Sequence, residues 1–373
     1  FGLMLGFNLQ EQNFLGSGNT VGIGINKNIY SEMYNLSFMN PYATKDGVSL
    51  GYNVYFRETD YGEFNVANYL TNSNGFGAQF GYPTSDITRL GFNVTYDKTD
   101  IDVGTLPALE IYDFVSAEGN IFETLSVQFS WQRITLNRGL FPTAGSSTVI
   151  SLSTTVPGSD LSYYRSSIRQ RYYRPLSSNF VFGFSGELGY LDAYGDTEET
   201  PFFQNFYAGG PRSLRGFESN TLGPRSTDAP CYEFNYEEKT CPNLIDTDGD
   251  GELDAPYVNP YAGSTSRYRD RPIGGNIKVE GSMQLIFRLP FIEDQRSLRS
   301  AFFFDFGNVF SDNCKDYQIN CYKPALEDLR YSYGVGVTWI TGFGPLSLAI
   351  SKPTNAGPQE RTEEFQFTVG NVF

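Results

Sequence analysis

The feature that most constrains the fold of this chain is a hydrophobic period of two that recurs along nearly its whole length. Apolar residues alternate with serine and glutamine in LSVQFSWQ (125–132), and with small residues in YSYGVGVTW (331–339). This period places the apolar side chains on one face of a β-strand. The other face carries small or polar side chains, which suits the crowded lumen of a membrane β-barrel. The pattern therefore predicts an all-β fold.

Runs of this kind, separated by turn-forming residues, predict fifteen strands. They lie near residues 1–14, 18–29, 31–41, 47–58, 73–83, 86–98, 116–135, 146–156, 162–175, 180–191, 274–291, 298–311, 329–341, 344–353 and 362–373. Bacterial single-chain barrels have an even number of strands because both chain ends lie on the periplasmic side. The odd count indicates a missing strand. Because the last predicted strand ends at Phe373, we expect the loss at the N-terminal end.

The predicted connections alternate between short and long. Residues 45–47 form a tight turn, whereas long loops are expected near 99–115, 312–328 and, above all, 192–273. Outer-membrane barrels show this asymmetry between periplasmic turns and extracellular loops. We therefore interpret residues 1–373 as one transmembrane antiparallel β-barrel with a long extracellular loop. A loop of that length without predicted structure indicates a function of its own.

The composition supports a membrane barrel. Aromatic residues make up 16% of the chain and charged residues only 18%, as expected for strands girdled by interfacial aromatic side chains. The alternative, a soluble β-sandwich or β-helix, would expose far more apolar surface than the roughly 300–600 Å² that soluble monomers tolerate. No apolar run predicts a transmembrane helix. The chain starts at Phe1 without a signal peptide, so we interpret it as a mature fragment.

Charge and residue usage exclude several classes of function. With 27 basic and 42 acidic residues, the chain lacks the clustered positive charge that nucleic-acid binding requires. It contains no histidine, so no imidazole can act as a general base, triad member or metal ligand. Without a nucleophile paired with a base, and without a nucleotide-binding motif, we expect no enzyme and no required cofactor.

Four ordered motifs and the C-terminus carry a family resemblance. The last residues, FQFTVGNVF (365–373), alternate and end in an aromatic residue, like the closing-strand signal of outer-membrane barrels. The motifs are FYAGGPRSLRGFESNTLGP (206–224), NPYATKDGVSLG (40–51), FPTAGSS (141–147) and VPGSDLSYY (156–164). They resemble the BamA family, the central subunits of the outer-membrane β-barrel assembly machinery. The arginine-glycine-aromatic element alone would mark only the wider superfamily, which includes two-partner secretion transporters.

The resemblance implies a barrel of sixteen strands whose long outer loop folds back into the lumen. It places Leu214, Arg215, Gly216 and Phe217 against the inner wall. A guanidinium inside the lumen needs an anionic partner, and it can grip a carboxylate through two parallel hydrogen bonds. The alternative interpretation is a loop arginine that remains in solvent.

Candidate partners for Arg215 follow from the alternation in two strands. In AFFFDFGN (301–308), Asp305 has the opposite parity to three phenylalanines, so it faces the lumen if they face lipid. Family members carry an aspartate at this position. In VEGSMQLIF (279–287), the inward face carries Glu280, Ser282 and Gln284. Gln284 stands where well-known members carry a second acidic residue, and Glu280 is expected to add charge.

The family resemblance also implies a function. Family members fold client barrels into the Gram-negative outer membrane by opening the seam between their first and last strands, where a strand edge can template an incoming strand. Here the seam would involve Phe373 and Gly370. Gly370 matches a family glycine that interrupts strand pairing at the seam. The alternative interpretation is a small residue that makes room for a neighbouring side chain in the lumen. The implied partners are unfolded outer-membrane proteins, outer-membrane lipids, and lipoproteins that dock through periplasmic repeat domains absent from this chain. The alternatives are a porin or secretion pore with a plug loop, and a receptor or adhesin that uses the acidic outer loops.

The stretch DTDGDGELD (246–254) matches part of a calcium-binding loop. The candidate metal ligands are Asp246, Asp248, Asp250, Glu252 and Asp254. The aspartates have the spacing of carboxylate ligands, and Glu252 is placed to supply a backbone carbonyl. The twelfth position of the loop is Tyr257 instead of a bidentate glutamate. The alternative interpretation is an acidic surface turn without a metal.

Four cysteines fall into two local pairs, both in predicted outer loops. Cys231 lies near Cys241, and Cys314 lies near Cys321. Local disulfides are expected in an oxidising compartment, although four cysteines allow three connectivities.

Overall fold

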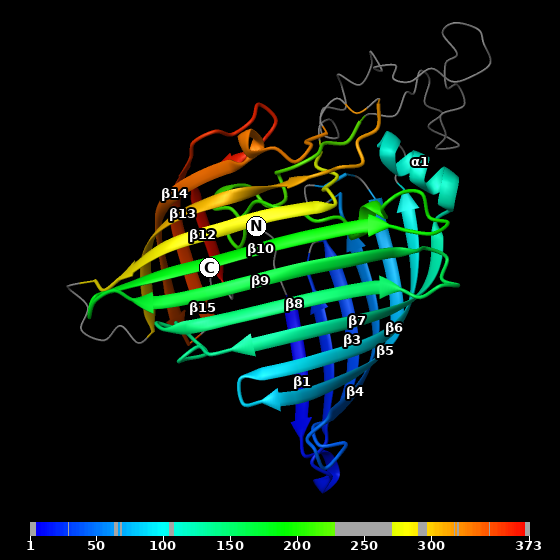
Figure 1. The fold of residues 1–373 in the computed structure, drawn as a ribbon, viewed down its shortest axis with the longest axis horizontal. Helices are drawn as coiled ribbons and strands as arrows, with labels where there is room; N and C mark the ends of the chain where they lie inside the picture. The colour runs from blue at the N-terminus through cyan, green and yellow to red at the C-terminus, as the bar shows by residue number, and fades with distance from the viewer. Residues whose placement is uncertain are drawn as a thin grey trace, which may run out of the picture.

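The computed structural model describes the chain except for residues 1–4, 29, 63–65, 68, 104–107, 228–270, 290–296, 317, 319–320, 343 and 370–373. The described residues form one antiparallel sheet of fifteen strands that curls into a barrel (Figure 1). Its strands are β1 (Leu5–Gln12), β2 (Thr20–Lys27), β3 (Ser31–Asn40), β4 (Ser49–Asp60), β5 (Tyr69–Ser85), β6 (Thr88–Val103), β7 (Ile121–Ile134), β8 (Gly145–Thr155), β9 (Tyr163–Pro175), β10 (Phe180–Ala193), β12 (Ile277–Phe287), β13 (Leu298–Phe310), β14 (Arg330–Thr341), β15 (Gly344–Pro353) and β17 (Phe365–Val369).

Each strand of the sheet pairs with the next one along the chain, with two exceptions. β10 pairs with β12, and β15 pairs with β17. The skipped strands, β11 (Gly216–Phe217) and β16 (Thr362–Glu363), pair with each other as a separate ribbon. Sequential antiparallel pairing is the topology expected of an outer-membrane barrel.

The fifteen strands predicted from the alternation are confirmed in number, and one helix was not predicted. The last strand, predicted over 362–373, enters the sheet only at Phe365, because Thr362–Glu363 form β16 and pair with β11 instead. α1 (Leu109–Glu118) occupies part of the expected loop at 99–115 and the start of the strand expected at 116–135. The helix forms there because it buries Ile111 and Phe114 against other outer loops. Within the described ranges, no helix is long and apolar enough to cross a membrane.

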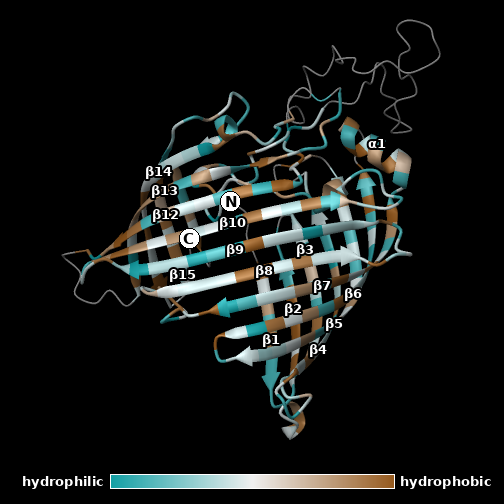
Figure 2. Cartoon of the chain, viewed as in Figure 1, coloured by the Kyte–Doolittle hydropathy of each residue, from teal (hydrophilic) through white to brown (hydrophobic). Residues whose placement is uncertain are grey.

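The two faces of the sheet differ as the alternation predicts. On β13, Phe302 and Phe304 are 51% and 40% exposed, whereas Phe303 and Asp305 are 4% and 0% exposed. Figure 2 shows the same alternation of apolar and polar residues along the other strands. The outward face is therefore the apolar surface that contacts lipid.

The outer ends of the strands are covered by a compact apolar cluster. Its buried members come from α1, from the loop after β10 and from strand ends; they include Tyr69, Phe114, Phe122, Phe202 and Ile273. Phe114 and Phe202 meet edge to face, with 5.3 Å between ring centroids, an arrangement that favours aromatic pairs. This cluster, which we call the outer cap, includes Ile111 and Phe114 of α1, the helix at the upper right of Figure 1. It fixes where the long loop leaves β10.

Truncating the centre of the outer cap should loosen it locally. We expect Phe114→Ala to lower the free energy of opening of the cap by about 3 kcal/mol, because it removes buried apolar area and leaves a cavity. Hydrogen exchange of the α1 amides measures this opening. Tyr112→Ala is the matched control, because Tyr112 lies on the exposed side of the same helix. Equal exchange in both variants would show that the cap does not depend on this packing.

Candidate functional site: the lumenal loop anchor

The long loop after β10 turns inward and buries the motif that the sequence singled out. Leu214 and Phe217 are fully buried, and Gly216 is buried between them. Leu214 and Phe217 belong to an apolar cluster that also contains Leu191 on β10 and Val309 on β13. Apolar contact with the inner wall therefore holds this part of the loop in place.

Arg215 is the charged centre of the site. Its Nε donates to Asp305 Oδ2 and its Nη2 donates to Asp305 Oδ1, each over 2.7 Å. The backbone N–H of Arg215 also donates to Asp305 Oδ2, over 3.2 Å. Arg215 is 4% exposed and Asp305 0%, which excludes the alternative of a loop arginine in solvent. The geometry is the two-pronged grip that a planar guanidinium makes with a carboxylate.

Two further wall residues contact the guanidinium. Arg215 Nη2 donates to Ser282 Oγ over 3.0 Å, and the Cζ atom lies 3.5 Å from the centroid of the Phe303 ring. A desolvated cation over an aromatic face is stabilised by the ring quadrupole. From the sequence, Ser282 was predicted to face inward but was given no role, and Phe303 was not identified as a contact. The parity that Phe303 shares with Asp305 was the signal that could have identified it.

Gln284 and Glu280, the other predicted partners, contact different groups. Gln284 Nε2 donates to Ser282 Oγ over 3.4 Å, so it supports the serine that accepts from Arg215. Glu280 accepts from Ser213 Oγ over 2.6 Å and pairs with Lys278 over 3.2 Å. The Glu280 carboxylate therefore holds the loop through the hydroxyl of Ser213, which directly precedes the motif.

Gly216 lies close against the inner wall at β15. Its φ of +91° lies in the left-handed region, which favours glycine. A Cβ at this position would lie 3.3 Å from both Pro353 Cδ and Ser351 Oγ on β15. Glycine fits here because the backbone angle would strain any other residue, and a Cβ would also be in tight contact with β15. On β17, Gln366 also contacts the motif; its inward parity between Phe365 and Phe367 was available in the sequence, but the residue was missed.

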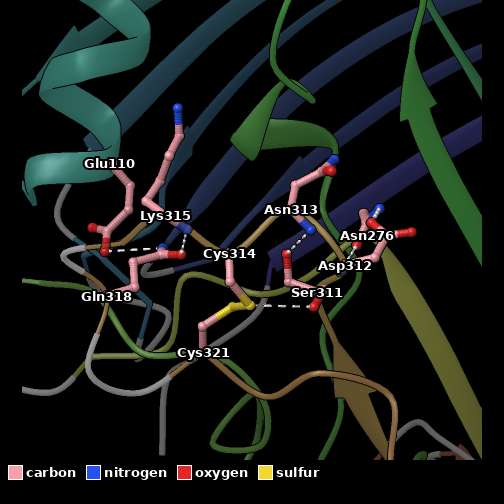
Figure 3. Close-up of a disulfide and its surroundings, with 9 residues drawn as sticks. All are labelled: Glu110, Asn276, Ser311, Asp312, Asn313, Cys314, Lys315, Gln318 and Cys321. Atoms are coloured by element: carbon pink, nitrogen blue, oxygen red, sulfur yellow. Dashed lines mark hydrogen bonds between the residues drawn. A yellow bond between two sulfur atoms is a disulfide. The ribbon is translucent and has the colours of Figure 1, made fainter.

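A second set of contacts ties the outer loops together around a disulfide (Figure 3). The predicted bond between Cys314 and Cys321 is confirmed, with their Cα atoms 5.8 Å apart. From this small loop, Gln318 Nε2 donates to Glu110 Oε1 over 3.1 Å. The backbone N–H of Thr227, in the long loop, donates to both oxygens of Glu110 over 3.0 Å. One carboxylate on α1 therefore joins three outer segments.

Burial raises the pKa of Glu110 above its ordinary value of 4.5, against the opposing effect of the hydrogen bonds from Thr227 and Gln318. These contacts border a cavity of about 60 Å³, which has room for ordered water molecules.

Several predicted site residues lie outside the described residues. They are Cys231 and Cys241, the candidate calcium ligands Asp246, Asp248, Asp250, Glu252 and Asp254, and the seam residues Gly370 and Phe373. The assignments made for them remain predictions.

The sheet, its lipid-facing surface and the loop bound inside it define an outer-membrane β-barrel with an inward-folded loop. The chain belongs to the Omp85 superfamily, because residues 13–373 match the Omp85 superfamily domain.

Individual relatives agree with this family. The chain is 28% identical over 398 residues to the outer membrane protein assembly factor BamA of Neisseria meningitidis, covering 100% of this chain and 45% of that protein. It is 22% identical over 334 residues to the sorting and assembly machinery component 50 homolog of Mus musculus, covering 88% of this chain and 61% of that protein. The chain thus spans about half the length of the curated relatives it matches.

Two solved structures resemble the fold. BamA from Haemophilus ducreyi lacking POTRA domains 1–3 superposes with a TM-score of 0.79 at 28% identity, covering 100% of this chain and 69% of that one. CdiB from Acinetobacter baumannii superposes with a TM-score of 0.57 at 11% identity, covering 98% of this chain and 55% of that one. The second likeness concerns the fold alone.

Removing the guanidinium should release the loop. We expect Arg215→Ala to destabilise the docked loop by about 3–5 kcal/mol, because it leaves the Asp305 carboxylate buried without its cation. Protease sensitivity of the loop in folded barrels measures the release. Arg212→Ala is the matched control, since Arg212 is an exposed arginine three positions earlier in the same loop. A loop that is equally protected in both variants would contradict the anchoring role.

Docking of the outer loops on Glu110 should weaken as the pH rises. A raised carboxyl pKa means that the docked state favours the protonated form, so its stability is greatest below the ordinary value of 4.5 and falls as the pH passes through the raised pKa. We expect Glu110→Gln, which is neutral at every pH, to remove this dependence. Exchange protection of the Thr227 amide, corrected for intrinsic rates, measures it. Glu118→Gln at the end of the same helix is the control and should keep the wild-type dependence; an unchanged dependence in Glu110→Gln would refute the assignment.

Proposed function

We propose that this chain is the membrane barrel of an outer-membrane protein assembly factor, which folds client β-barrel proteins and inserts them into the membrane. The observation that carries the proposal is the full-length similarity to the assembly factor BamA of Neisseria meningitidis, together with the fold shared with the BamA barrel of Haemophilus ducreyi. No covalent step is needed. The folding energy of the client supplies the driving force.

The edges of the sheet support a seam mechanism. Within the described residues, β1 and β17 are the two edge strands of the sheet. There β1 pairs with β2 alone, and β17 pairs with β15 alone. An edge strand presents N–H and C=O groups that can pair with an incoming strand. Outward apolar side chains, such as Leu9 on β1 and Phe367 on β17, keep such a strand at the level of the lipid. A client strand would therefore add to the barrel while it enters the membrane.

The inward loop distinguishes this proposal from a passive pore. In an open porin the lumen conducts, whereas here the loop is bound to β13 by an ion pair and to β12 through Ser213 and Glu280. We propose that the loop stays docked while the seam works, which gives little steady current. A secretion pore with a plug loop would instead have to release these contacts.

The proposed partners follow from the same function. They are unfolded outer-membrane proteins, the lipids of a Gram-negative outer membrane, and lipoproteins that reach the barrel through periplasmic repeat domains of a longer protein. Gly370 and Phe373 would lie at the seam. Calcium binding at 246–254 remains a proposal of its own.

A vesicle assay tests the function. We expect the purified protein in lipid vesicles to accelerate folding of an added urea-denatured client barrel by about tenfold, equivalent to a barrier lowered by about 1.4 kcal/mol. Vesicles that contain an unrelated porin serve as the control. No acceleration, combined with a stable open-channel current, would favour the pore instead.

A further inference from the structure

Gln366 is a buried polar side chain that connects β17 to the lumenal motif. Its strand neighbours Phe365 and Phe367 are exposed on the outer face, whereas Gln366 is 1% exposed and faces inward. Gln366 Nε2 donates to the carbonyl oxygen of Phe217 over 2.8 Å. Its Oε1 accepts from the backbone N–H of Gly216 over 3.4 Å. One side-chain amide therefore satisfies two backbone groups of the motif, much as a paired strand would.

The segment that leads into β17 is fastened to the same loop. β11 (Gly216–Phe217) pairs with β16 (Thr362–Glu363). The contact continues from the end of β11 to the residue before β16, where the backbone N–H of Glu218 donates to the carbonyl oxygen of Arg361 over 3.0 Å. The backbone N–H of Arg361 in turn donates to Thr221 Oγ1, also over 3.0 Å. The loop and the approach to β17 thus share a continuous hydrogen-bonded contact.

The same stretch of loop is held on the opposite side by β13. Arg215, directly before Gly216, is bound to Asp305. Residues 215–217 therefore bridge β13 and β17, which are separated in the sheet by β14 and β15. β17 itself pairs with β15 over the five positions from Phe365 to Val369, and within the described residues it has no other partner in the sheet. The loop is thus a second support for the last strand.

We infer that Gln366 is a positioning residue that locks the last strand of the sheet to the lumenal loop. The inference rests on the proposed function, because it is the seam that makes the position of β17 matter. The ion pair fixes Arg215 to β13, and Gln366 binds the next two loop residues. The position of the ion pair therefore determines the position of the β17 edge. The strand then stays ordered with β15 as its one sheet neighbour in the described part of the chain.

Gln366→Met tests the lock, because methionine is similar in length and shape but makes none of the hydrogen bonds of the amide, whose Nε2 also donates to Glu363 Oε2 over 3.4 Å. Thr368→Val is the matched control: Thr368 lies on the same face of β17, and its buried Oγ1 has no hydrogen-bond partner within the described structure. Hydrogen exchange of the full chain in lipid vesicles is followed for peptides covering 213–218 and 362–369. We expect exchange in both peptides to rise about tenfold in Gln366→Met, since the two hydrogen bonds to the motif and the one to Glu363 are lost. Thr368→Val should exchange like the wild type.

The client-folding rate is measured on the same samples. We expect Gln366→Met to fold clients roughly threefold more slowly, because a template strand that must first be ordered costs conformational entropy. Unchanged exchange would overturn the lock, and raised exchange with an unchanged folding rate would overturn its role at the seam. If Gln366→Met does not fold, Gln366→Asn, whose amide is one methylene shorter, is measured in the same way. If the wild type accelerates no client, the proposed function fails, while the exchange result still decides whether Gln366 holds β17.

Discussion

The bidentate ion pair between Arg215 and Asp305 is the interaction on which the arrangement inside the barrel depends. It joins a loop residue to a wall residue 90 positions later in the chain, and both side chains are buried. A buried ion pair is costly to desolvate, so its net contribution to stability is small compared with the penalty for losing one partner. Its main effect is to specify a single position for the loop, because any other position leaves a charge unpaired. The apolar cluster around Leu214 and Phe217 supplies the stabilisation.

The rest of the loop is organised around that fixed point. Ser213 binds the Glu280 carboxylate, and Gly216 fits closely against β15. Farther out, Thr227 reaches Glu110 on α1, which also accepts from the disulfide loop through Gln318. The inner anchor and the outer cap therefore hold the two ends of one segment. The segment thus connects the outer loops to the lumen and, through Gln366, to the last strand.

Most of the fold could be predicted from the sequence because strand parity is a local property. The alternation in β13 alone indicated that Asp305 faces inward, and the structure agrees. α1 could not be predicted, because ten residues with a weak periodic pattern become helical only by packing on the outer cap. The ribbon of β11 and β16 is two residues long on each side, too short for any periodicity. Gln366 lies 149 residues from Phe217, so its role depends on tertiary placement.

A double-mutant cycle measures how strongly the Arg215 and Asp305 side chains depend on each other. Arg215→Ala, Asp305→Ala and the double variant are compared by the free energy of loop release, measured from protease cleavage of folded barrels in lipid. We expect a coupling free energy of at least about 2 kcal/mol, because each single variant leaves the other charge buried and unpaired. A coupling energy indistinguishable from zero would contradict this expectation and would show that apolar packing alone positions the loop.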